Sequence, residues 1–171
     1  METDRLYYHD SYLKEFRATV LHTQTMGGLT EVVLDRTAFH PEGGGQPSDL
    51  GLLGGFPVIS VVDRDGEVVH QTQGMVIDGE VVGLIDWGRR FDFMQQHSGQ
   101  HILSQAFERV LGASTVSFHI GLDASTIDIN TPTLTPEDVE AVEVMANDVV
   151  FENRPIQAQL VDPSDLARFQ L

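Results

Sequence analysis

Short runs of alternating hydrophobic and polar residues, separated by glycine-containing turns, fill the first half of the chain. Runs rich in valine flank the pairs Gly27-Gly28 and Asp65-Gly66. Such a spacing of β-branched runs and turn residues is typical of a small barrel or sandwich. We therefore predict that residues 1–88 form a small β subdomain, either a barrel or a sandwich.

The hydrophobic pattern changes from a strand period to a helical period near residues 87–92. Asp92 is a suitable N-cap, and apolar residues then recur every three to four positions to about Leu111. Gly112 directly follows, and glycine is the usual residue just beyond a helix end. We therefore predict a helix from Asp92 to about Leu111.

The rest of the chain combines strand-like and helical runs. Residues 114–122 and 126–129 have the pattern of a strand pair. Thr135-Pro136 then provides a cap and a first-turn proline for a second helix that ends near residue 153. Residues 89–171 are accordingly predicted to form an α+β module after the β module.

Two histidines, His97 and His101, lie four residues apart on the first predicted helix. One helical turn takes about 3.6 residues, so both rings project from one face, and that face is polar. Neutral imidazole is a common zinc ligand, which makes the pair a candidate for half of a metal site. A non-ligating surface pair is the alternative. His119 falls on a predicted strand, and we interpret it as structural rather than as a third ligand.

A second motif, between Phe39 and Pro47, contains three consecutive glycines followed by a glutamine: Gly43, Gly44, Gly45 and Gln46. Consecutive glycines leave the backbone bare, so that its N–H groups can approach a phosphate, ribose or carboxylate. A flexible connector between strands is the alternative. The motif is not a P-loop, because it lacks the Gly-Lys-Ser/Thr sequence.

Composition limits the function classes further. A net charge of −16, from 10 Lys and Arg against 26 Asp and Glu, argues against a nucleic acid bound over the whole surface. Arg89-Arg90 is either a local exception or an ordinary solvated turn. The absence of cysteine excludes disulfides and thiolate ligands within the chain. Without an apolar run of about 18 residues or a secretory signal, we expect no membrane association and a cytoplasmic location.

The order of these motifs resembles that of alanyl-tRNA synthetase editing domains and of the freestanding, AlaX-type alanyl-tRNA editing proteins. The resemblance covers residues 5–162 and rests on Phe39-His-Pro-Glu-Gly-Gly-Gly-Gln46, Arg89-Arg90, His97-Ser-Gly-Gln-His101, Leu111-Gly112 and Thr135-Pro-Glu-Asp138. Ser117-Phe-His-Ile-Gly121, followed by Ser125-Thr-Ile-Asp128, is more similar to the freestanding proteins than to the synthetase.

The resemblance implies a fold and a metal. The fold would be a β-barrel-like N-terminal subdomain followed by an α+β editing core, in which the helix with His97 and His101 packs on an antiparallel sheet. Both histidines would hold zinc, with two further ligands from a later Cys-x-x-x-His motif. Because the chain has no cysteine, we expect a truncated form whose remaining ligands lie beyond Leu171. A divergent member that recruits His119 or a carboxylate is the alternative.

The resemblance also implies an activity, namely the zinc-dependent hydrolysis of serine or glycine wrongly attached to the alanine tRNA. The chain would then be an aminoacyl-tRNA deacylase whose partner is aminoacylated tRNA(Ala). Gly43, Gly44, Gly45 and Gln46 would line the aminoacyl-adenosine pocket, and Ser117, or Thr115, would contact the serine hydroxyl. Whether the truncated chain alone is active stays open. The alternatives are a catalytically silent tRNA-binding or interaction module and a metal-dependent hydrolase of small esters or amides.

Overall fold

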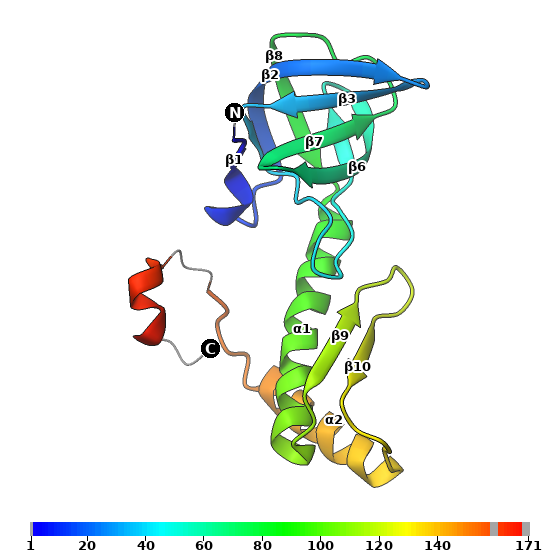
Figure 1. The fold of residues 1–171 in the computed structure, drawn as a ribbon, viewed down its shortest axis with the longest axis vertical. Helices are drawn as coiled ribbons and strands as arrows, with labels where there is room; N and C mark the ends of the chain where they lie inside the picture. The colour runs from blue at the N-terminus through cyan, green and yellow to red at the C-terminus, as the bar shows by residue number, and fades with distance from the viewer. Residues whose placement is uncertain (1, 158–160, 169–171) are drawn as a thin grey trace.

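The computed structural model describes residues 2–157 and 161–168, which form a mixed α and β structure. Six antiparallel strands of the N-terminal half pair in a closed order, so that they form a barrel (Figure 1). In order of pairing they are β2 (Glu15–Met26), β3 (Leu29–Leu34), β7 (Glu67–Thr72), β6 (Phe56–Arg64), β5 (Gly51–Leu53) and β8 (Glu80–Ile85). The turns predicted at Gly27-Gly28 and Asp65-Gly66 connect β2 to β3 and β6 to β7. Both turn predictions are confirmed.

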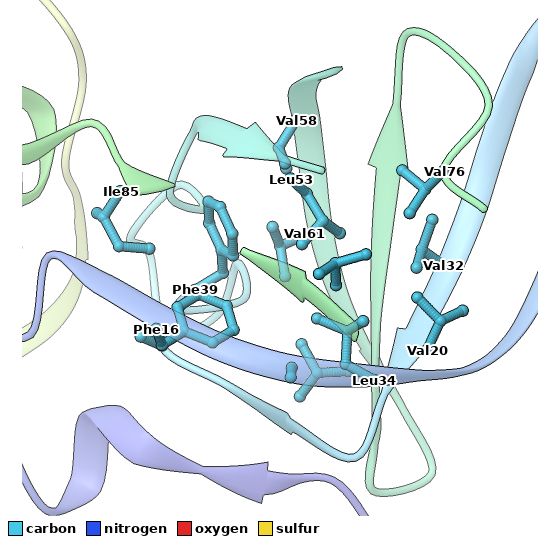
Figure 2. Close-up of a cluster of buried hydrophobic side chains, with 14 residues drawn as sticks. Phe16, Val20, Val32, Leu34, Phe39, Leu53, Val58, Val61, Val76 and Ile85 are labelled. Atoms are coloured by element: carbon cyan, nitrogen blue, oxygen red, sulfur yellow. The ribbon is translucent and has the colours of Figure 1, made fainter. Parts of the chain in front are cut away.

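The barrel encloses one hydrophobic core, which also anchors the Gly-rich loop. Along β2 the side chains alternate, with Phe16 buried and Arg17 exposed, as expected for a strand with one face on a core. Figure 2 shows Phe16 and Leu34 directed into the same cluster as Phe39. Phe39 is fully buried, and its ring meets that of Phe16 edge-on at 5.7 Å between centroids. The loop that follows Phe39 therefore starts from a fixed point.

His70, on β7, is a fully buried histidine beside this core. Its Nδ1 atom lies 3.0 Å from the carbonyl oxygen of Val32, and its Nε2 atom lies 2.8 Å from the Thr37 hydroxyl. A carbonyl can only accept, so Nδ1 carries the proton and Nε2 accepts from Thr37. The ring is thus neutral, with both nitrogens satisfied.

We expect the protein to lose about 2 to 3 kcal/mol of stability between pH 7.5 and pH 4.5 through His70 alone. Burial lowers the pKa of His70 to about 4, whereas the unfolded chain titrates near about 6.5. In this window the unfolded state binds the proton first, so the free energy of unfolding falls as the pH falls. Urea unfolding at several pH values measures this slope. His70→Asn should flatten it, and His22→Asn, at an exposed site, should not; equal slopes in both variants would contradict the prediction.

The C-terminal half is built on the long helix α1 (Trp87–Leu111). The antiparallel strands β9 (Thr115–His119) and β10 (Thr126–Ile129) lie along α1, and α2 (Pro136–Phe151) crosses near its far end (Figure 1). A second, smaller cluster joins these elements through Ala106, Phe107, Val142, Ile127 and Ile129. None of the described helices is both long and apolar enough to cross a membrane.

Three short elements complete the described structure. The strands β1 (Asp4–Arg5) and β4 (Arg36–Thr37) pair in parallel, and the 3-10 helix η1 (Leu6–Tyr8) follows β1 directly. A second 3-10 helix, η2 (Pro163–Arg168), lies near the C-terminus. The pairing of β1 with β4 brings η1 close to the loop that leaves β4.

The start of α1 differs from the sequence prediction, whereas its end agrees. The N-cap is Asp86, whose carboxylate accepts from the Arg89 amide at 3.2 Å, and Asp92 lies inside the helix. The prediction of Asp92 as the N-cap was therefore wrong. Gly112 ends the helix in the left-handed conformation, with φ of 63°, as predicted. Because α1 begins at Trp87, the predicted boundary between residues 88 and 89 falls in its first turn, and two separate subdomains stay a prediction.

Candidate functional site

His97 and His101 face one another on α1. Their Nε2 atoms are 3.1 Å apart, and their ring centroids are 4.9 Å apart. Two nitrogens that each lie about 2.05 Å from one tetrahedral zinc are separated by about 3.3 Å. The pair thus needs little adjustment to share an ion. Among the described residues no cluster of three or more histidine or acidic side chains could complete such a site. The described structure therefore fits half of a metal site.

Gln46, from the Gly-rich loop, orients the His97 ring. Its amide oxygen lies 2.8 Å from Nδ1 of His97, and an oxygen can only accept. The proton therefore sits on Nδ1, and the Nε2 lone pair is directed toward His101, which is how an outer hydrogen bond prepares a metal-binding imidazole. Burial, and then the neighbouring His101 ring, lower the pKa of His97, so the neutral form prevails at pH 7.

The Gly-rich loop turns tightly between α1 and β9. Gly43 and Gln46 exchange backbone hydrogen bonds of 3.1 and 3.0 Å, and the two glycines between them have φ values of 56° and 81°. The amides of Gly43 and Gln46 are thus used within the turn, which leaves fewer free N–H groups than the glycine run predicted. A Cβ atom on Gly45 would overlap the carbonyl oxygen of Phe118. Only glycine fits at this position, because the loop lies so close to the backbone of β9.

A buried ion pair holds the base of this loop against α1. Asp49 and Arg90 are 1% and 3% exposed, and Nε of Arg90 lies 2.9 Å from both carboxylate oxygens. The Asp49 carboxylate also accepts from the His40 amide at 2.6 Å, and the Asp49 amide donates to the His40 carbonyl at 3.0 Å. Arg90 and His97 are seven residues apart, so they lie on one face, about two turns from each other. The loop therefore docks on α1 twice, through Asp49 at Arg90 and through Gln46 at His97.

This ion pair corrects one sequence interpretation and reveals a missed residue. Arg90 is neither a nucleic-acid contact nor part of a solvated turn, because its charge is buried and compensated. Arg89 differs, since its guanidinium lies over the Phe93 ring at 4.5 Å and donates to the Ser48 carbonyl. Asp49 was not singled out from the sequence; its place at the end of the Gly-rich motif, ahead of a strand, was the available signal.

The structure does not bring Ser117 to the histidines. Ser117 is exposed and donates to Asp128 across the hairpin. A register shift between Asp128 and Ile129 turns Thr115 toward α1, where its hydroxyl donates to Ser104 at 2.8 Å. The β9 side chain next to the site is Phe118, whose ring centroid lies 5.7 Å from that of His97. Of the two hydroxyls considered, Thr115 is thus the one that faces the helix of the site.

Two cavities along α1 lie close to the Gln46–His97 contact, and a third, of about 280 Å³, has His101 in its wall. The first, of about 360 Å³, contains the side chains of Gln46 and His97 in its wall, together with Tyr7, Tyr8, Ser11, His40, Arg90, Met94 and Ser98. Its volume falls within the range of small-ligand pockets. The second, of about 240 Å³, lies between α1 and the β9–β10 hairpin and includes Gln100 and Phe118. The predicted residues Gln46 and His97 therefore meet at the edge of a cavity.

Several known proteins are similar in sequence to this chain. The alanyl-tRNA editing protein AlaX-M of Methanosarcina mazei is 36% identical over 173 residues, which cover 93% of this chain and 68% of that protein. The alanyl-tRNA editing protein Aarsd1 of Bos taurus is 38% identical over 91% of this chain, and the alanine–tRNA ligase of Pyrobaculum aerophilum is 42% identical over 93% of it. The chain spans 38% of that Aarsd1 and 18% of that ligase. No family model matches the chain.

Proposed function

This chain belongs to the alanyl-tRNA editing proteins of the AlaX-M type, and on that premise we propose that it hydrolyses serine or glycine wrongly attached to tRNA(Ala). In this reaction water adds to the ester carbonyl, and the bond to the ribose oxygen breaks to release the free amino acid and the tRNA. The observation that carries the proposal is the convergence of His97 and His101 beside Gln46. The proposed partner is aminoacylated tRNA(Ala), and the proposed location is the cytoplasm.

The residues of the site have distinct proposed roles. His97 and His101 would hold zinc, which supplies Lewis acidity to activate water or to position the ester. Gln46 keeps the proton of His97 on Nδ1, so that Nε2 stays free as a ligand atom. The loop formed by Gly43, Gly44 and Gly45 would border the aminoacyl-adenosine.

Selection of serine over alanine would need a polar partner in the pocket. A site shaped only by size discriminates weakly between such similar side chains. The Thr115 hydroxyl, which hydrogen-bonds to Ser104 on α1, is directed toward the helix of the site, and the Ser117 hydroxyl is not. We therefore assign the hydroxyl contact to Thr115 in preference to Ser117.

Deacylation assays test this function. Ser-, Gly- and Ala-tRNA(Ala) are incubated with the protein, and bound zinc is measured in parallel. We expect the protein to release serine or glycine faster than alanine, to lose activity with a chelator, and to regain it with zinc. Binding of tRNA without release would favour a silent module. Turnover of small esters without a tRNA moiety would favour a general hydrolase, and either result would overturn the proposal.

A further inference from the structure

Three aromatic rings form a row at the start of α1. The Tyr12 ring lies 5.5 Å from that of Trp87, and Trp87 stacks on Phe91 at 5.5 Å with 28° between the planes. Tyr12 is 58% exposed and Phe91 is 38% exposed. Neighbouring large apolar side chains left open to solvent are typical of a contact surface. We call Tyr12, Trp87 and Phe91 the aromatic row.

Lys14 adds a positive charge to the aromatic row. Its Nζ atom lies 4.4 Å from the Trp87 ring centroid. Seven of the ten lysines and arginines form ion pairs with carboxylates, whereas Lys14, Arg89 and Arg109 form none with any described residue. In a chain with a net charge of −16, the cation over the aromatic row is thus one of few that remain available to a phosphate.

Two of the carboxylates near the aromatic row in sequence, those of Asp10 and Asp86, accept from backbone amides. Asp10 accepts from the amide of Tyr12 at 2.8 Å, and Asp86 accepts from the amide of Arg89 at 3.2 Å as the N-cap of α1. Neither carboxylate forms an ion pair with Lys14. Lys14 thus forms no ion pair with any carboxylate of the described residues.

The aromatic row continues along α1 into the cavity beside His97. One stripe of the helix carries, at intervals of four, three and four residues, Trp87, Phe91, Met94 and Ser98. The last two of these line the cavity, as does Ser11, the residue before Tyr12. At 1.5 Å per residue the stripe is about 16 Å long. A chain-like ligand that lies on the aromatic row can therefore reach the histidine pair without leaving this face.

We propose that the aromatic row and Lys14 bind the single-stranded 3′ end of the tRNA and direct its terminal adenosine into the cavity beside His97. The proposal rests on the proposed function, which makes tRNA the partner. Bases of single strands stack on exposed aromatic side chains whatever their sequence, and nearby cations contact the backbone phosphates. The row thus offers binding sites for the bases, and Lys14 one for a phosphate, next to the reacting ester.

Trp87 is the only tryptophan of the chain, so its fluorescence reports on the aromatic row directly. The protein is titrated with a short single-stranded RNA that ends in ACCA and with a duplex RNA of equal length. We expect saturable quenching by the single strand, weaker binding as salt rises from about 50 to 200 mM, and no matching response to the duplex.

Variants with matched controls identify the residues responsible. Tyr12→Leu and Phe91→Leu should each weaken binding of the single strand about 5- to 150-fold, the range for one lost base stack. Lys14→Gln should reduce the magnitude of the slope of log affinity against log salt concentration by about 0.7. Phe151→Leu, at a site 87% exposed on α2, and Arg17→Gln, with the same change of charge, should leave affinity unchanged. Equal losses in the control variants would overturn the proposal.

Deacylation separates this inference from the proposed function. In Tyr12→Leu and Lys14→Gln we expect a raised KM for Ser-tRNA(Ala) with kcat little changed, because the row would contact a part of the substrate that does not react. If hydrolysis is normal in these variants and Trp87 does not respond to RNA, the inference fails and the function stands. If Trp87 responds to RNA but no substrate is hydrolysed, the proposed function fails and RNA binding by the aromatic row stands. Trp87 emission typical of a buried indole would show that polypeptide covers the row, and would also overturn the inference.

Discussion

His101→Ala is expected to remove bound zinc and deacylation while leaving the fold intact. The Nε2 atom of His101 lies 3.1 Å from that of His97, so its loss leaves one nitrogen where two converge. Replacing a residue that only hydrogen-bonds to a metal ligand already lowers metal affinity about 10- to 100-fold. Replacing a ligand itself should therefore lower metal affinity at least about 100-fold. His101 is exposed, so its removal should change the free energy of unfolding by less than about 0.5 kcal/mol.

Metal analysis, circular dichroism and Ser-tRNA(Ala) hydrolysis check this expectation on one preparation of the protein. His119→Ala is the matched control, because it removes another exposed histidine near the site. A normal zinc content in His119→Ala would also argue against a divergent site that recruits this residue. Unchanged zinc stoichiometry in His101→Ala would contradict the assignment of the pair.

Asp49→Ala is expected to destabilise the protein by about 3–5 kcal/mol, because it leaves the Arg90 charge buried without a partner. The carboxylate is 1% exposed and also holds the His40 amide. Such a loss is a large part of the about 5–15 kcal/mol that usually stabilises a domain. For a chain of this size it corresponds to a fall of roughly 10 °C in Tm. The loop that presents Gln46 should loosen as well, which would weaken zinc binding.

Urea unfolding of two further variants makes this prediction specific. Glu80→Ala removes the partner of Arg17 from an exposed ion pair, in which 65% of the Glu80 side chain and 69% of the Arg17 side chain are accessible. This change should lower the free energy of unfolding by less than about 1 kcal/mol. Asp49→Ala combined with Arg90→Met should recover part of the loss, because no charge is then left buried. A cost below about 1 kcal/mol for Asp49→Ala, or no recovery in the double variant, would contradict the role assigned to this pair.

Features governed by neighbouring residues could be predicted from the sequence. The turns at Gly27-Gly28 and Asp65-Gly66 and the end of α1 at Gly112 follow local rules of backbone conformation, and the structure confirms them. The common face of His97 and His101 follows from the helical period, and their nitrogens do converge. Whether they hold a metal stays a prediction.

Features that depend on distant partners could not be predicted. Asp86 and Asp92 are equally good N-caps by sequence, and the early start of α1 places Arg90 opposite Asp49, which is 41 residues away. The orientation of Thr115 depends on a register shift against β10 that no alternation of residue types in β9 reveals. The contact between Gln46 and His97 spans 51 residues and needs both the loop and the helix in place.

The double attachment of the Gly-rich loop limits how its length can change. Asp49 and Gln46 bind side chains two turns apart on one rigid helix, and Phe39 fixes the start of the loop in the barrel. An insertion or deletion between His40 and Asp49 would move at least one of these anchors away from its partner. Added residues are more easily accommodated in the hairpin turn between β2 and β3, where a Cβ atom on Gly27 or Gly28 would meet nothing within 4 Å.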